Sequence, residues 1–125
     1  MPASKKRTVI IVEDDSSVSQ ALERILRLGG FASSTYASAE ALLANDGVEN
    51  AMCLIVDVQL PGISGFALRD RLSMKGALPP VVFITAFDEP EARAKASSAG
   101  AAAFLAKPFS GRVLLETIRR ATRLS

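Results

Sequence analysis

The sequence predicts an α/β fold in which five parallel strands form a doubly wound sheet with helices on both faces. Short apolar runs rich in Val and Ile recur along the chain and lack the alternation of a half-exposed strand. Segments with helical spacing of apolar residues separate these runs, and the connections are short. A strand followed by a helix, repeated five times, requires right-handed crossovers and therefore indicates a parallel sheet.

The five predicted strands differ in the strength of their signal. The first, third and fourth are apolar and rich in β-branched residues, as expected for strands covered on both faces. The second is more polar, and the fifth is short and built largely from small residues. The predicted strands are residues 9–12, 31–36, 54–56, 81–84 and 102–105.

Five helices are predicted between and after these strands. The first has a Ser16 cap and ends at the pair Gly29 and Gly30. Each of the others begins at a serine or a proline, residue types that suit a cap or a first helical turn. These helices begin at Ser38, Ser64, Pro90 and Ser110, and end near Leu43, Gly76, Gly100 and Arg123.

Composition favours one globular domain over residues 1–125, because 125 residues that are 49% hydrophobic and 22% charged leave no room for a second, output domain. The single cysteine, Cys53, lies in an apolar run and cannot form an intramolecular disulfide, so we expect a cytoplasmic protein. No apolar segment is long enough to cross a membrane, and we expect no membrane partner.

Two further properties of the composition exclude function classes. The chain contains no histidine, which excludes imidazole bases and a phosphohistidine on this chain, so carboxylates must carry any phosphate chemistry. Net charge is only +2, although arginines recur along the last segment. We interpret these as a solvated helix face and expect no direct nucleic-acid binding by this domain.

Polar residues follow the strands at the places where this fold binds its ligands. Parallel sheets of this kind bind ligands at the carboxyl ends of their strands. The residues found there are Glu13, Asp14, Asp57, Thr85 and Lys107. Acids after a strand often cap a helix, and a loop lysine is usually solvated, but together they must converge on one crevice in this fold.

Three carboxylates crowded together repel each other, and a divalent cation with hard oxygen ligands relieves that repulsion. Mg²⁺ is the natural candidate, with Mn²⁺ as a substitute, because it combines one or two carboxylates with waters and a phosphate oxygen. With Asp57 as the attacking carboxylate, the product is an aspartyl phosphate. Lys107 and Thr85 then interact with the phosphoryl oxygens as a point charge and a hydroxyl donor.

The motifs at these strand ends resemble the receiver family of two-component signalling. They are Val-Glu-Asp-Asp at 12–15, Val-Asp-Val-Gln-Leu-Pro-Gly-Ile-Ser-Gly at 56–65, Ile-Thr-Ala at 84–86 and Ala-Lys-Pro-Phe at 106–109. The resemblance covers roughly residues 7–122 and is closest to bacterial receivers attached to helix-turn-helix transcription factors. It implies a flavodoxin-like (βα)₅ fold with strand order 2-1-3-4-5, and a phosphoacceptor rather than an enzyme that turns over substrate.

The resemblance also implies a role for each residue near the metal. Asp57 is the phosphoacceptor and a metal ligand, Asp14 is a direct ligand, and Glu13 is a more distant, water-mediated one. The backbone carbonyl of Gln59 completes the protein ligands, and Asp15 stays outside the site. The Lys107–Pro108 bond is often cis in this family.

On the phosphoryl side, the resemblance implies contacts from the backbone N–H groups of Val58 and Ala86. It also implies that Thr85 and Phe104 shift inward when the domain is phosphorylated. Because phenylalanine has no hydroxyl to satisfy, we expect the inward form to be partly populated before phosphorylation. Gln59 and Phe87, two residues after the acceptor and the threonine, flank the path of a hydrolytic water, and the apolar ring predicts a longer phosphate lifetime.

The implied partners are a sensor histidine kinase or a phosphotransfer protein. A second copy of the chain is the other implied partner, through the surface of the fourth helix, fifth strand and fifth helix. An alternative is a pseudo-receiver that keeps the fold as a protein-binding module without phosphorylation. A phosphatase with an aspartate nucleophile, or a nucleotide binder, requires other strand-end motifs than Glu-Asp-Asp-Ser-Ser. Whether the chain acts alone or as the N-terminal part of a transcription factor stays open.

Overall fold

The computed structural model describes residues 8–45, 47–76, 78–86 and 89–123. Five strands form one parallel sheet in the order β2-β1-β3-β4-β5, which confirms the predicted parallel sheet and the strand order that the resemblance implies. The strands are β1 (Thr8–Val12), β2 (Ala32–Tyr36), β3 (Cys53–Asp57), β4 (Val81–Thr85) and β5 (Ala103–Ala106). The helices are α2 (Ser16–Leu28), α3 (Ala39–Leu43), α4 (Gly65–Lys75), α5 (Pro90–Ser98) and α6 (Gly111–Arg123), with a short 3₁₀ turn, η1 (Val48–Asn50).

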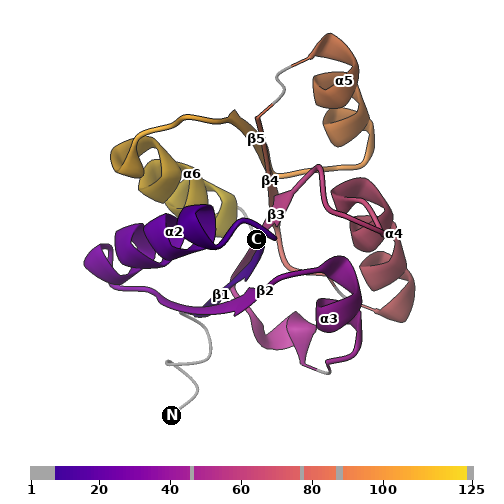
Figure 1. Ribbon diagram of the computed structural model, residues 1–125, viewed down its shortest axis with the longest axis horizontal. Coiled ribbons are helices and arrows are strands. Elements are labelled where there is room, and N and C mark those ends of the chain that lie inside the picture. The colour runs from indigo at the N-terminus through magenta and orange to yellow at the C-terminus, as the bar shows by residue number, and fades with distance from the viewer. Residues whose placement is uncertain (1–7, 46, 77, 87–88, 124–125) are drawn as a thin grey trace.

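The helices form two layers, one on each face of the sheet (Figure 1). Helices α2 and α6 lie on one side, and α3, α4 and α5 lie on the other (Figure 1). Strands β3 and β4 are buried along their whole length, whereas the edge strand β2 has no buried residue. This difference explains why the second strand has the weakest apolar pattern in the sequence.

Each layer seals its own apolar cluster against the sheet. The α2/α6 layer covers a cluster that includes Leu22, Leu26, Cys53, Leu114 and Ile118. The opposite layer covers a second cluster, which includes Leu54, Val56 and Phe83 from the sheet. Alternate residues of each central strand enter the two clusters, as the pleat of a strand requires.

The cap of the first helix differs from the prediction. Asp15, and not Ser16, is the N-cap of α2, because its extended backbone lets its carboxylate accept hydrogen bonds from the N–H groups of Ser17 and Val18. Ser16 is the first helical residue instead. The predicted caps Ser38 and Ser64 are confirmed, since each accepts a hydrogen bond from the N–H three residues further on.

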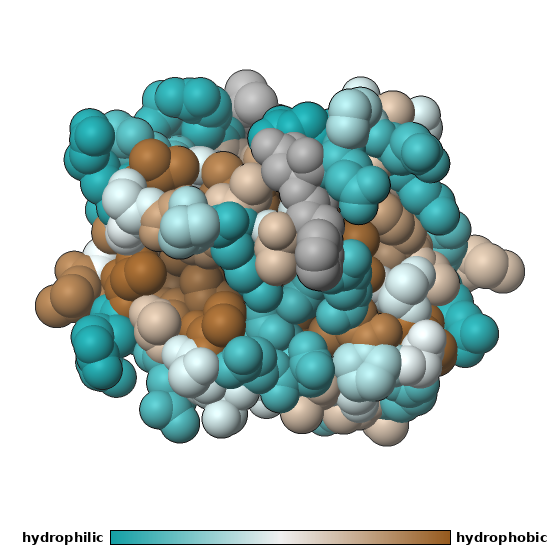
Figure 2. Space-filling view, turned by 45° about the horizontal axis from the view of Figure 1, so that its top comes forward, coloured by the Kyte–Doolittle hydropathy of each residue, from teal (hydrophilic) through white to brown (hydrophobic). Residues whose placement is uncertain are grey.

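Gly29 and Gly30, the glycine pair after α2, have different structural roles. Gly30 has a φ of +88°, a left-handed conformation that glycine adopts without strain. Gly29 leaves room for the Leu115 side chain of α6, because a Cβ at this position would lie 2.5 Å from its Cδ2. Next to this contact, a groove of about 360 Å³ between α2 and α6 is lined partly by Ile25, Leu28 and Leu115. Figure 2 shows apolar side chains gathered on this side of the molecule.

Candidate functional site

The acidic residues predicted for the site meet at the carboxyl end of the sheet. Strands β1 and β3 are parallel neighbours with Val12 opposite Val56, so the residues that follow them lie side by side. Ligand atoms of Glu13, Asp14 and Asp57 lie within 4.8 Å of one another. Glu13 and Asp57 are buried, whereas Asp14 is exposed. Two carboxylates are therefore enclosed while the third faces solvent.

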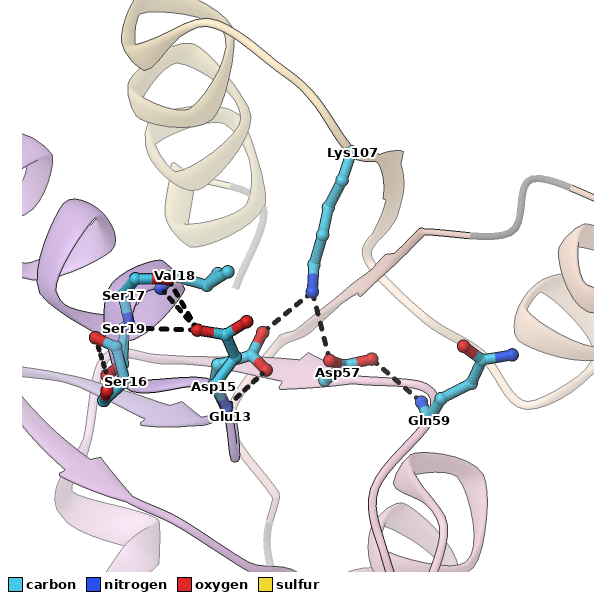
Figure 3. Close-up of polar contacts among 9 residues, drawn as sticks. All are labelled: Glu13, Asp15, Ser16, Ser17, Val18, Ser19, Asp57, Gln59 and Lys107. Carbon is cyan, nitrogen blue, oxygen red and sulfur yellow. Dashed lines mark hydrogen bonds and ion pairs between the residues drawn. The ribbon is translucent and has the colours of Figure 1, made fainter.

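Lys107 connects the two buried acids. Its Nζ lies 2.9 Å from Oε1 of Glu13 and 3.1 Å from Oδ2 of Asp57 (Figure 3). The backbone N–H of Lys107 donates to the carbonyl of Thr85 at 2.7 Å, which fixes the start of the long side chain beside β4. The Lys107–Pro108 bond that follows is cis. The ammonium thus offsets part of the negative charge that the sequence places here.

The pKa directions in this cluster follow from burial and pairing. Burial raises the pKa of Glu13 above its usual value, and hydrogen bonds from Lys107 and from the Asp15 N–H oppose the rise only in part. For Lys107, burial alone lowers the pKa, but the hydrogen bonds to Glu13 and Asp57 prevail and raise it. The lysine therefore stays charged at neutral pH.

Asp15 lies outside this acidic cluster, as expected. Its side chain caps α2, and the hydrogen bond from Ser17 holds the pKa of its carboxyl below the usual value. Its contribution to the site is a backbone one, since the Asp15 N–H donates to Oε2 of Glu13 at 3.1 Å. Two neighbouring acids in the sequence, Asp14 and Asp15, thus have separate roles.

The backbone after Asp57 presents two consecutive N–H groups with different partners. The Val58 N–H donates to the carbonyl of Ile84 at 2.9 Å and so extends the hydrogen bonding between β3 and β4. The N–H that reaches the acceptor is that of Gln59, which donates to Oδ1 of Asp57 at 2.9 Å (Figure 3). The contact of the Val58 N–H with a phosphoryl group stays a prediction, and the Gln59 N–H is a second candidate donor in this loop. An aspartate side chain that accepts from the N–H two residues on is a common turn signal, so the sequence contained the clue.

Gly65 fixes the far end of the same loop. Its N–H donates to the carbonyl of Val58 at 3.0 Å. A Cβ at this position would overlap the carbonyl oxygen of Asp57, so only glycine allows α4 to begin so close to the acceptor. Ser64 then caps α4 through the N–H of Ala67.

The remaining predicted residues surround the end of β4. Thr85 is its last residue and is buried, and Ala86 after it is exposed. Phe104 lies on β5 opposite Phe83 and is partly buried, with the guanidinium of Arg93 5.0 Å from the centre of its ring. Phe87 lies outside the described residues.

The arrangement suits a cation and a nucleophilic carboxylate. Three acidic side chains supply hard oxygen donors of the kind that Mg²⁺ prefers. The Asp57 carboxylate is held at both oxygens, by the Gln59 N–H and the Lys107 ammonium. A carboxylate fixed in this way beside a cation site can attack a phosphoryl group.

Comparison with known proteins agrees with this geometry. The model of the family described as the response regulator receiver domain matches residues 9–119. The chain belongs to this receiver family.

Similar proteins include nodulation protein W of Bradyrhizobium diazoefficiens, which is 34% identical over 96% of this chain and 53% of that protein. Response regulator protein TmoT of Ectopseudomonas mendocina is 35% identical over 97% of this chain and 55% of that protein. Among solved structures, the crystal structure of FixJ-N matches with a TM-score of 0.85 and 35% identity, covering 94% of each chain. This receiver domain spans about half the length of the curated relatives named here. Among the residues that the structure describes, no helix is long and apolar enough to cross a membrane.

Proposed function

We propose that this receiver domain takes a phosphoryl group onto Asp57 from the phosphohistidine of a sensor histidine kinase or a phosphotransfer protein. The N–P bond of the phosphohistidine breaks as a carboxylate oxygen of Asp57 forms the new O–P bond. The observation that carries the proposal is the state of Asp57, which is buried, held at both oxygens and grouped with two further acids.

Each neighbouring group has a task in this transfer. Lys107 pairs with the phosphoryl oxygens and opposes their charge, while the hydroxyl of Thr85 and the N–H groups of Gln59 and Ala86 donate hydrogen bonds to them. Asp14, Asp57 and the Gln59 carbonyl would hold Mg²⁺ or Mn²⁺, with Glu13 as a more distant acid. The bound cation neutralises negative charge on the phosphoryl oxygens.

The test is the mass of the intact protein after incubation with acetyl phosphate and Mg²⁺. We expect one phosphoryl group on the unmodified protein and none on Asp57→Asn. Asp70→Asn, which neutralises an exposed acid on α4, is the matched control and should label normally. Labelling should stop when a chelator removes Mg²⁺.

A pseudo-receiver is the alternative function. It keeps the fold as a binding module and is not phosphorylated. Acid groups and a lysine that already pair in the site favour phosphorylation over this alternative. The absence of an adduct with acetyl phosphate and with a histidine kinase would favour the pseudo-receiver instead.

The signal leaves, in this proposal, through Thr85 and Phe104 to the surface formed by α5, β5 and α6. Phosphorylation shifts both side chains inward and changes this surface, which then binds a second copy of the chain or another protein. Sedimentation with and without a beryllofluoride phosphate mimic tests the dimer. A monomer in both states at high protein concentration would contradict it.

The lifetime of the phosphoryl group depends on Gln59 and Phe87 in this proposal. An apolar ring at position 87 cannot orient a hydrolytic water, so we expect slower phosphate loss than with an acid there. Phe87→Glu should shorten the lifetime of the aspartyl phosphate, and Phe87→Ala should shorten it less. Equal rates of loss in all three proteins would refute this role.

A further inference from the structure

The loop that follows Asp57 is held by a residue that the site itself does not contain. Glu40, in the first turn of α3, extends its carboxylate to this loop. Its Oε2 accepts a hydrogen bond from the Ile63 N–H at 3.3 Å. The two residues are 23 positions apart in the sequence, so the contact joins separate parts of the fold.

Gly62 provides the space for this carboxylate. A Cβ at position 62 would lie 2.5 Å from Oε2 of Glu40, so a side chain there would displace the carboxylate from its present position. Gly62 also has a φ of +77°, which directs the following N–H toward the carboxylate without backbone strain. The Glu40 carboxylate therefore lies against the loop at two adjacent residues, Gly62 and Ile63.

The short helix that carries Glu40 is held in place by buried side chains and an N-cap. Its neighbours Ala39 and Leu42 are fully buried in the apolar cluster on this face of the sheet. Ser38 caps the helix by accepting a hydrogen bond from the Ala41 N–H at 3.0 Å. A side chain on so firmly packed a turn can restrain a loop instead of following its motion.

The loop restrained by Glu40 carries the backbone groups of the site. Gln59 is four positions before Ile63, and its N–H donates to Oδ1 of Asp57. Leu60 is buried, and the Gly65 N–H bonds to Val58, so the loop is fixed near both ends. The contact with Glu40 adds a restraint at its tip.

We propose that Glu40 is a positioning residue for cation binding at Asp57, because its contact with Gly62 and Ile63 fixes the loop that presents the Gln59 carbonyl. The inference rests on the proposed function, in which that carbonyl is a ligand of Mg²⁺. Glu40 does not touch the cation in this proposal and acts through the loop.

Three variants that each remove one negative charge test the proposal. Glu40→Ala removes the hydrogen bond, and Glu40→Gln keeps an oxygen that can accept it. Glu23→Ala is the matched control, because Glu23 is also a helical carboxylate with one exposed hydrogen bond, to Thr35 on β2. Since all three change the net charge equally, an effect confined to Glu40→Ala reflects the lost hydrogen bond.

Two measurements are made on the unphosphorylated full chain. In the metal-free protein, hydrogen exchange of the Ile63 amide should be faster in Glu40→Ala than in the other proteins. In a calorimetric titration with MgCl₂, the dissociation constant should be about two- to five-fold higher in Glu40→Ala, the loss expected for one exposed hydrogen bond. Glu40→Gln and Glu23→Ala should remain near the unmodified protein in both.

The outcomes separate the inference from the proposed function. Unchanged Mg²⁺ affinity in Glu40→Ala, even with a lower melting temperature, overturns the positioning role alone. An equal loss in Glu40→Gln also overturns it, because the charge and not the hydrogen bond would then matter. If the unmodified protein binds no Mg²⁺, the proposed function and the inference fail together.

Discussion

Helices α6 and α5, on opposite faces of the sheet, are held to it in different ways. Helix α6, in the layer with α2, buries Leu114, Ile118 and Ala121 along one stripe. Of the nine residues of α5 in the opposite layer, all of which the structure describes, Ala96 alone is buried. Two cations supplement it, since Arg93 lies over the ring of Phe104 and Lys95 over the ring of Phe66.

This difference indicates which of the two helices can respond to events at Asp57. An apolar stripe locks a helix to the sheet, whereas one alanine and two cation–π contacts contribute far less. Segments with few buried apolar contacts open at a small free-energy cost. We therefore interpret α6 as a rigid support and α5 as the element that moves, beside the Phe104 ring that the proposed switch uses.

The largest expected difference is in thiol reactivity, between Cys53 in the cluster under α2 and α6 and a thiol placed under α5. Cys53 lies in the α2/α6 cluster, where burial raises the pKa of its thiol to about 12 from the usual 9.0. At pH 8 the thiolate fraction is then about 1000-fold lower than for an ordinary cysteine, and alkylation with iodoacetamide should slow at least as much relative to the unfolded protein.

A second thiol placed under α5 sharpens the contrast. In Ala96→Cys, the new thiol is expected to label faster than Cys53, because α5 opens locally without global unfolding. Mass spectrometry of peptides at successive times gives both rates from one sample. Equal labelling rates at the two positions would show that α5 opens only together with the cluster around Cys53 and would refute the comparison.

A smaller difference is expected in the free energy of unfolding that is lost when a contact of α6 or of α5 is removed. Leu114→Ala leaves a cavity under α6 and should lower the free energy of unfolding by about 2–5 kcal/mol. Lys95→Ala removes one cation–π contact of α5 and should lower it by about 0.5–1 kcal/mol. Urea unfolding followed by circular dichroism measures both, and similar losses would contradict a firmly held α6 and a weakly held α5.

The fold and the acidic cluster were predictable because they depend on short-range patterns and on topology. Apolar runs identify the strands, and a parallel sheet places all their carboxyl ends at one edge, so Glu13, Asp57 and Lys107 had to meet. The pairing of Lys107 with both acids follows from the same convergence.

The details that the sequence could not decide depend on the direction of single backbone groups. Asp15 and Ser16 are both good capping residues, and only the backbone angles decide between them. Val58 and Gln59 are consecutive, and the hydrogen bond from Val58 to Ile84 decides which N–H faces Asp57. No local pattern indicates that Glu40 reaches Ile63 across 23 positions, because that contact requires α3 and the loop after Asp57 to be packed first.

The smallest expected effect concerns the contact between the Arg93 guanidinium and the Phe104 ring. The partly buried ring of Phe104 lies beneath Arg93, and this contact favours the position seen in the structure. Arg93→Ala removes about 0.5–1 kcal/mol of that preference, so the population of the alternative ring position should rise about two- to five-fold before phosphorylation. The Phe104 ring signals in NMR spectra report the shift.

Lys95→Ala is the matched control for this prediction, since it removes a similar contact of α5 but over Phe66. If Arg93 holds Phe104 outward, only Arg93→Ala should shift the Phe104 signals toward those of the beryllofluoride-bound protein, and it should also accelerate phosphorylation by acetyl phosphate by a similar factor. Equal shifts in both variants would mean that Phe104 senses a general loosening of α5. Unchanged signals in both would mean that the packing of β5 alone sets the ring position. The difference between α6 and α5 would then have no effect on the proposed switch.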